Sequence, residues 1–240
     1  MTTSPRWLSQ LTDILANTKE EIALALSTVD TDGNVPIPRV RHHLYRNVLT
    51  KNPIRPLLAT ATDVRTPKVH QLCSHPDTSG PTAEVAWWFP PRAQFRLTVR
   101  TYVLPSPSHK LHSQFPTKAL AYSGDSSSSP DALETPAEWE KLRVKTFNSM
   151  PAFLRASYVR PTPGSNLSNP DDAKKWPKEL PESGNEGSEE ERKQVQEALK
   201  NFAVLLLEPV EVDLVEFDDP DRRTKWKQVR NEWREQAVVP

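Results

Sequence analysis

Basic side chains in one short segment of the chain have the spacing that a phosphate-binding site requires. Arg41 and Arg46 lie five residues apart, and Thr66-Pro67-Lys68 downstream has the pattern of a helix N-terminus. A phosphate monoester is nearly dianionic, and two or three cations together with free amides at a helix N-terminus commonly hold it. The pattern therefore favours an anion site. The alternative is that the arginines only solvate an exposed strand.

The two arginines can meet one anion only under a condition on the backbone. Side chains alternate between the two faces of a strand, so regular alternation places Arg41 and Arg46 on opposite faces. Both can reach the same phosphate if the strand bulges or ends between them.

The elements that would position these residues are mainly strands. Residues 94–102 give the strongest strand pattern, because Gln94, Arg96, Thr98 and Arg100 alternate with Phe95, Leu97, Val99 and Thr101. Residues 30–34 have the composition of a turn between the first two strands. The other predicted strands are residues 21–29, 36–45, 57–62, 83–89, 201–207 and 211–217.

Four helices are expected. The first begins with Ser4 as N-cap and Pro5 at the first helical position. The second follows Thr66-Pro67 and packs Val69, Leu72 and Cys73, whose thiol we expect to be buried and unreactive. The remaining two follow capping boxes, at residues 135–138 and 188–191. For residues 218–240 the sequence pattern is compatible with either a helix or a hairpin.

Length and composition favour a single domain over residues 1–240. Two stretches rich in Ser, Pro, Asn and Gly, at about residues 106–136 and 161–190, are expected to be mobile insertions within it.

Charge and hydropathy limit the possible partners. Lys plus Arg and Asp plus Glu are 31 each, so no global field draws the chain to nucleic acid or to an anionic membrane. Nucleic-acid binding through the basic hairpin is therefore disfavoured. The apolar stretch at residues 202–207 is far shorter than the ~20 residues of a membrane helix. With a single cysteine and no signal-peptide pattern, we expect a soluble cytoplasmic protein.

A metal site is not expected. His42 and His43 alternate across a strand, and neither they nor His70 have Cys or acidic partners at ligand spacing. Trp87, Trp88 and Phe89 are expected in the core, with stacking on a ring as the alternative.

In their order along the chain, these segments resemble the pyridoxamine 5'-phosphate oxidase-like FMN-binding proteins, in a branch divergent from the true oxidases. The resemblance covers roughly residues 5–104 and 201–240, and rests on the arginine-rich hairpin, Thr62-Asp63-Val64-Arg65-Thr66-Pro67-Lys68, and Trp87-Trp88-Phe89 leading to Gln94-Phe95-Arg96. It implies a mainly β fold with flanking helices, the split β-barrel of the FMN-binding type. It also implies a homodimer with FMN at the subunit interface.

The resemblance implies a cofactor role for particular residues. Arg41, Arg46 and Lys68 fall where the family binds the FMN phosphate, and Thr62 where a hydroxyl contacts the cofactor. Gln94 falls where a glutamine meets the isoalloxazine ring, with Arg96 on the same strand face as a cation for reduced flavin.

The chain departs from the family at two places. Pro67 stands where the oxidases have a phosphate-binding arginine, a contact that Arg65 could replace. The C-terminal Arg-x-His pair that grips pyridoxamine phosphate is absent, and Arg223 is the nearest substitute as a cofactor contact. The expected function is an FMN-dependent oxidoreductase acting on an unidentified small molecule, and these two departures argue against pyridoxamine phosphate as that molecule. The alternative is a non-catalytic flavin- or ligand-binding module of the same fold.

Overall fold

The fold is taken from a computed structural model, which describes residues 4–18, 22–50, 52, 54–73, 83–91, 93–121 and 133–240. These residues form two compact units. The first unit holds the described parts of residues 1–60, 71–101 and 206–240. The second holds those of residues 61–70 and 102–205.

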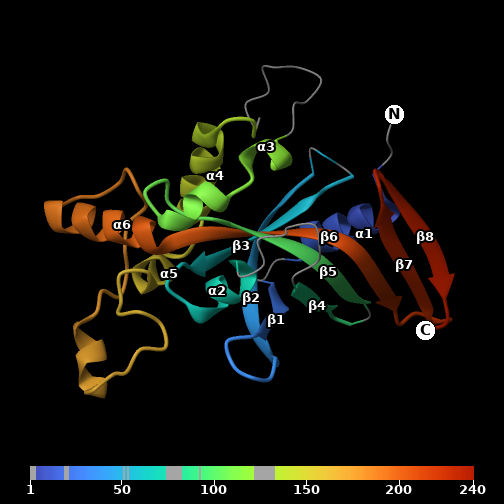
Figure 1. The fold of residues 1–240 in the computed structure, drawn as a ribbon, viewed down its shortest axis with the longest axis horizontal. Helices are drawn as coiled ribbons and strands as arrows, with labels where there is room; N and C mark the ends of the chain where they lie inside the picture. The colour runs from blue at the N-terminus through green and yellow to red at the C-terminus, as the bar shows by residue number, and fades with distance from the viewer. Residues whose placement is uncertain are drawn as a thin grey trace. The chain divides into compact units, whose positions relative to one another are not determined.

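The first unit is built on an eight-stranded sheet in the order β3-β2-β1-β4-β5-β6-β7-β8 (Figure 1). A further pairing of β3 with β6 closes six of these strands into a barrel, and β7 and β8 extend the sheet beyond it. This confirms the predicted mainly β split barrel. The strands are β1 (Ala23–Asp30), β2 (Ile37–Leu49), β3 (Leu57–Asp63), β4 (Ala83–Phe89), β5 (Ala93–Leu104), β6 (Phe202–Glu216), β7 (Arg222–Val229) and β8 (Glu232–Val238).

Alternation decides which side chains of the predicted strands enter the core. In β5, Phe95, Leu97 and Val99 are fully buried while Gln94, Arg96 and Thr98 are partly exposed, as the sequence predicts. In β4, Trp87 and Phe89 are buried, but Trp88 is 50% exposed and lies against the exposed ring of Phe217. The core expectation for Trp88 was therefore wrong, because Trp88 lies on the strand face opposite to its two neighbours.

The last barrel strand is longer than the sequence indicates. Residues 201–207 and 211–217 are predicted as two strands separated at Pro209, whereas β6 runs unbroken from Phe202 to Glu216. Proline removes one N–H donor from a strand. The ladder with β7 begins only at Glu211, so the missing N–H of Pro209 costs no bond to β7.

The C-terminal residues left open by the sequence form the hairpin β7–β8. Trp226 pairs with Glu235 across the two strands, so the helical spacing of Trp226 and Trp233 does not produce a helix. Helix α1 (Arg6–Asn17) packs its Trp7 ring edge-to-face on Trp233 with centroids 5.2 Å apart. Its N-cap is Pro5, one residue later than predicted, and no side chain caps this end.

The second unit is mostly helical. The predicted capping box at residues 135–138 is present at the start of α4. At α6, Ser188 caps the amide of Glu191 as predicted, while the Glu191 carboxylate accepts from the amide of Gly187 instead of completing the box. The helices are α2 (Pro67–Cys73), which ends in the first unit, η1 (Lys110–Gln114), α3 (Thr117–Leu120), α4 (Pro136–Asn148), α5 (Ala152–Ser157), η2 (Pro170–Lys175) and α6 (Glu189–Asn201).

Both predicted insertions fall largely in the second unit. Residues 106–121 contain η1 and α3, residues 122–132 lie outside the described part of the chain, and residues 161–190 contain η2. In the described residues, no helix has the length and apolar character needed to span a bilayer.

Candidate functional site

Arg41 lies on β2, where uncharged partners hold its side chain in place. Along one face of β2, His43 is 5% exposed, Arg41 is intermediate and Arg39 is exposed, so this row runs from the core outward. The Arg41 guanidinium donates to the Thr28 hydroxyl and, at 3.1 Å, to the Gln71 side-chain oxygen. The Thr28 hydroxyl donates in turn to the same Gln71 oxygen at 2.7 Å.

These partners orient the Arg41 charge without neutralising it. Thr28 and Gln71 are 2% and 9% exposed, and Arg41 forms no ion pair with a carboxylate of the described residues. Burial lowers the pKa of Arg41, and the neighbouring charge of Arg39 lowers it further. An oriented guanidinium that is partly desolvated and lacks a counter-ion is suited to bind an external anion.

Arg46 lies at a break in the β2–β3 ladder. Tyr45 pairs with Thr60 and Asn47 with Ala59, so the register shifts across Arg46. An irregularity in this part of β2 is the condition that alternation sets for both arginines to reach one phosphate, and the register shift falls at Arg46 itself. A bulge of this kind frees Arg46 from strict alternation.

Thr62 and Lys68 lie in the second unit, at the end of β3 and in the first turn of α2. Thr62 is 2% exposed and Lys68 is intermediate. Helix α2 has only seven residues, and its first residue, Pro67, has no N–H to offer an anion. The Thr66 hydroxyl donates to the Asp63 carbonyl at 2.7 Å.

Arg65 is committed to the structure of the second unit. Its guanidinium makes a bidentate pair with Asp63, with contacts of 2.6 and 2.9 Å, and donates to the carbonyls of Tyr158 and Arg160. With its donors used in this way, Arg65 does not replace the phosphate-binding arginine that Pro67 displaces.

Gln94 and Arg96 share the partly exposed face of β5. The side-chain amide of Gln94 makes no hydrogen bond to the described residues, so its donor and acceptor groups are available to a ligand. Arg96 donates to Asp213 on β6 at 2.8 Å. The cation expected beside the flavin therefore already has a carboxylate partner.

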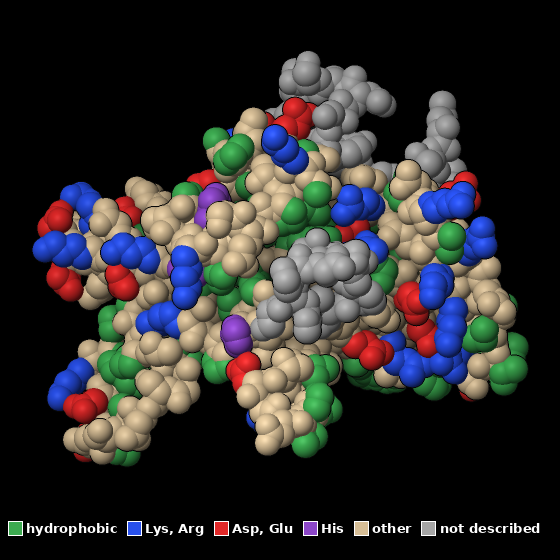
Figure 2. Space-filling view, viewed as in Figure 1, with side chains coloured by type: hydrophobic (Ala, Val, Ile, Leu, Met, Phe, Trp, Pro, Cys, Tyr) green, Lys and Arg blue, Asp and Glu red, His purple; other side chains and the backbone are tan. Residues whose placement is uncertain are grey.

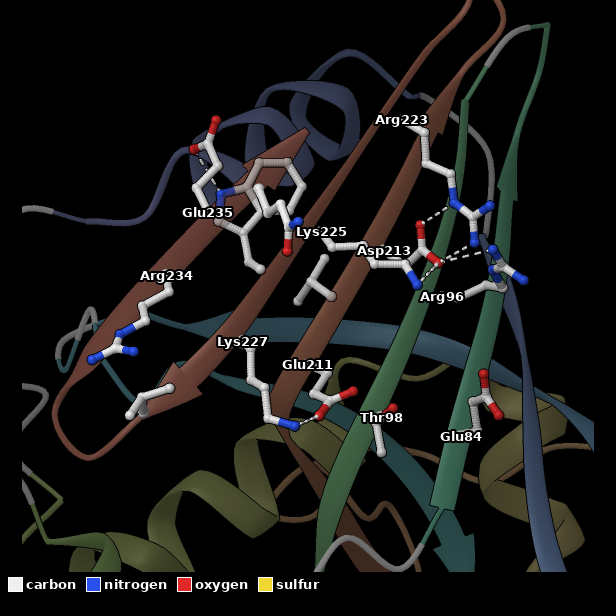
Figure 3. Close-up of a pocket in the computed structure, with 14 residues that line it drawn as sticks. Glu84, Arg96, Thr98, Glu211, Asp213, Arg223, Lys225, Lys227, Arg234 and Glu235 are labelled. Carbon is white, nitrogen blue, oxygen red and sulfur yellow. Dashed lines mark hydrogen bonds and ion pairs between the residues drawn. The ribbon is translucent and has the colours of Figure 1, made fainter. Parts of the chain in front are cut away.

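Arg223 lies on β7 in an open groove of about 720 Å³ that crosses the outer face of β4–β8 (Figure 3). It pairs with Asp213 through two contacts of 3.0 and 2.8 Å. The hydrogen bond to Asp213 raises the pKa of Arg223. Burial alone would raise the pKa of Asp213, but the hydrogen bond from Arg223 and the charges of Arg96, Arg223 and Lys225 outweigh it and lower that pKa.

The structure thus brings Arg41, Arg46, Gln94 and Arg223 into the first unit and Thr62 and Lys68 into the second. Sequence reasoning missed Thr28 and Gln71. The hairpin register, which pairs Thr28 with Arg39 next to Arg41, was a usable signal for Thr28. Gln71 contacts Arg41 only through tertiary packing, so no sequence pattern indicated its role. In the described residues, no group of three His, Cys, Asp or Glu side chains could hold a metal ion.

Comparison with known proteins gives the same family as the sequence motifs. Residues 4–105 match the family model described as pyridoxamine 5'-phosphate oxidase, FMN-binding domain. The sequence has no match among curated proteins.

Two solved structures share the fold. A pyridoxamine 5'-phosphate oxidase-related, FMN binding protein from Nostoc punctiforme PCC 73102 superposes with a TM-score of 0.68 at 21% identity, over 100% of both chains. PhzG from Burkholderia lata 383, in complex with tetrahydrophenazine-1-carboxylic acid, superposes with a TM-score of 0.57 at 15% identity, over 98% of this chain and 89% of PhzG.

The matched range contains α1 and β1 to β5, and with them Arg41, Arg46, Thr62, Lys68 and Gln94, whereas Arg223 lies outside it. The C-terminal half of the resemblance, residues 201–240, is supported by the shared fold alone. Residues 4–105 of this chain thus match the FMN-binding domain of the pyridoxamine 5'-phosphate oxidase family, and this match supports FMN as the cofactor.

Proposed function

We propose that the protein is an FMN-dependent oxidoreductase that acts on a small molecule. The observation that carries the proposal is Arg41, which is partly desolvated, lacks a carboxylate partner in the described chain, and is held by Thr28 and Gln71 inside the range matching the FMN-binding family. The flavin supplies the redox chemistry when bound, and the protein supplies binding, orientation and charge.

The proposed roles divide between the ends of the cofactor. Arg41 and Arg46 bind the phosphate on β2, and Gln94 hydrogen-bonds the isoalloxazine edge. Thr62 and Lys68 contribute a hydroxyl and a second cation, and each is to be tested by its own variant. Arg223 is the weakest of the six assignments, because its guanidinium is paired with Asp213.

The proposal includes a homodimer with FMN at the subunit interface, working in the cytoplasm, where Cys73 stays reduced. Pyridoxamine phosphate oxidation is not proposed. The sequence has no C-terminal Arg-x-His pair, and Arg222 and Arg223 are directly adjacent to each other.

The test begins with the purified chain. We expect flavin absorption bands, release of FMN on denaturation, and re-binding of added FMN by the stripped protein. A colourless preparation that takes up no FMN would overturn the proposal. Light scattering at several concentrations gives the mass, which should be that of two chains.

Turnover separates an enzyme from a binding module. Bound flavin should be reduced by NADPH or NADH and reoxidised by oxygen or by a small oxidised metabolite. A protein that binds FMN stoichiometrically but is reduced by neither donor would support the non-catalytic module.

A further inference from the structure

The groove on the outer face of β4–β8 has the size and polarity of a site for a small molecule. Its volume of about 720 Å³ lies within the roughly 300–1,000 Å³ typical of ligand pockets. All of its lining residues belong to the first unit. Figure 2 shows Lys and Arg side chains, with some acidic ones, gathered where Figure 1 places β7 and β8.

The charged side chains that β7 presents to this groove are all cations. Because side chains alternate, Arg223, Lys225 and Lys227 share one face of β7, while Trp226 is buried on the other. On the side of β6, these cations meet two carboxylates. Asp213 contacts Arg223 at 2.8 Å and Lys225 at 3.9 Å, and Glu211 contacts Lys227 at 2.5 Å.

On the side of β8, the same cations meet no carboxylate across the strand pair. Lys227 stands directly opposite Arg234, and Lys225 opposite Gln236. Like charges directly opposite each other destabilise a sheet. Arg234 forms no ion pair with a described residue, and Figure 3 shows it pointing away from both carboxylates.

The groove therefore has more positive than negative charge. Five cations line it, and three carboxylates share its face, which leaves an excess of two positive charges. Glu235 does not change this balance, because its carboxylate is directed to the other face, where it accepts from the Trp226 indole at 2.8 Å and from Arg6 at 2.6 Å. The cations are Arg96, Arg223, Lys225, Lys227 and Arg234, and the carboxylates are Glu84, Glu211 and Asp213.

Protection of a sheet edge accounts for only part of this arrangement. Strand β8 is the last strand of the sheet, and charged side chains on an edge strand discourage pairing with other chains. Arg234 could serve that purpose. Lys227 lies on β7, which is paired on both sides and is not an edge strand. Edge protection therefore does not explain why Lys227 stands opposite another cation, Arg234.

We propose that this groove binds a small organic dianion, a dicarboxylate or a phosphate ester, with Lys227 and Arg234 as its principal contacts. The anion lies between β7 and β8 and supplies the negative charge that the strand pair lacks. Its principal contacts, Lys227 and Arg234, are not among the six residues assigned to FMN, so we treat the groove as a site separate from the one at Arg41, although Arg223 lines it.

Isothermal titration at low ionic strength tests the proposal with two probes, malate and glucose 6-phosphate, and with glucose as the neutral control. At least one dianion should bind, and glucose should not. Lys227→Ala and Arg234→Gln should each weaken binding about fivefold, the upper range for an exposed ion pair. Lys200→Ala, which removes an exposed cation from α6, is the matched control and should bind as the parent does.

The thermal midpoint of the ligand-free protein gives a second readout. Arg234→Gln removes the like-charge opposition to Lys227, so the midpoint should stay the same or rise. A midpoint lowered by this change would show that Arg234 is structural and would overturn the assignment.

Three binding results would also overturn the proposal. They are no binding of either probe, equal loss of binding in Lys200→Ala and Arg234→Gln, and displacement of the probe by equimolar FMN. FMN binding is measured separately by the flavin spectrum, so a failure of the groove and a failure of the proposed function are told apart.

Discussion

The guanidinium of Arg41 on β2 donates at 3.1 Å to the side-chain oxygen of Gln71, the fifth residue of α2. Gln71 comes from a different element and carries no charge. A carboxylate at this position would have neutralised Arg41, whereas the amide fixes its direction and leaves the charge to attract an anion. This arrangement makes the phosphate assignment specific enough to test.

Arg41→Ala should weaken FMN binding by about 1.5–3 kcal/mol, the range for a hydrogen bond to a charged group, or on the order of 10- to 150-fold. Lys68→Ala should have an effect of the same size. Fluorescence titration of the stripped protein measures both.

Riboflavin is the control for these two variants, because it has the ring system without the phosphate. Its affinity should be unchanged in both. Unchanged FMN affinity in both variants would remove the phosphate assignment.

Gln71→Leu should reduce FMN affinity by less, about 2- to 10-fold, because it removes an orienting hydrogen bond worth roughly 0.5–1.5 kcal/mol and leaves the charge in place. The ratio of FMN to riboflavin affinity measures the effect. Gln194→Leu, at a partly exposed glutamine on α6, is the matched control. A Gln71→Leu protein that stays folded and keeps the parent ratio would show that Gln71 does not position Arg41.

Glu208→Ala should lower the free energy of unfolding by about 3–5 kcal/mol, because it leaves a buried ion pair without its anion. The Glu208 side chain is fully buried and contacts Arg55 at 2.6 Å and Arg100 at 3.7 Å. Glu197→Ala breaks an exposed pair with Lys200 and should cost less than about 1 kcal/mol. Urea denaturation of the three proteins gives the comparison, and equal losses would contradict it.

Asp213→Asn should destabilise the protein in a pH-dependent way. The folded-state pKa of Asp213 is lowered, so its ionised form contributes stability above the ordinary pKa of about 3.9. This contribution is lost as the pH falls from there through the folded-state pKa. The difference in unfolding free energy between parent and variant should therefore be constant from pH 7 to 5 and shrink toward pH 3. A difference that does not change with pH would mean that Asp213 stabilises by packing alone.

The sequence predicted those features of the fold that depend on local patterns. Alternation identified β5 and the faces of its side chains. For Arg41 and Arg46 it gave a bulge or a strand end only as the condition for a shared phosphate, and the structure has a register shift between Tyr45 and Asn47. The capping box at Thr135 was readable because both of its partners lie within four residues.

Features that depend on distant contacts were not predicted. Strand β6 continues across Pro209, and its ladder with β7 begins only at Glu211. The sequence of residues 201–217 alone does not show where a neighbouring strand begins to pair. Asp213 on β6 pairs with Arg96 on β5 and with Arg223 on β7. Because these residues are distant in sequence, the sequence could not show that Arg96 belongs to an ion-pair cluster.

Strand β6 also determines when the barrel can form during synthesis. It pairs with β3, β5 and β7, and residues 64–201 separate it in sequence from β3. The ribosome therefore releases β1 to β5 well before the strand that closes them exists, and pairing over such a separation is slow. During that interval β3 has an unpaired edge, and three of its own residues, Leu58, Ala59 and Thr60, are fully buried once the barrel has closed. Until β6 has been made, this unpaired edge exposes the nascent chain to aggregation.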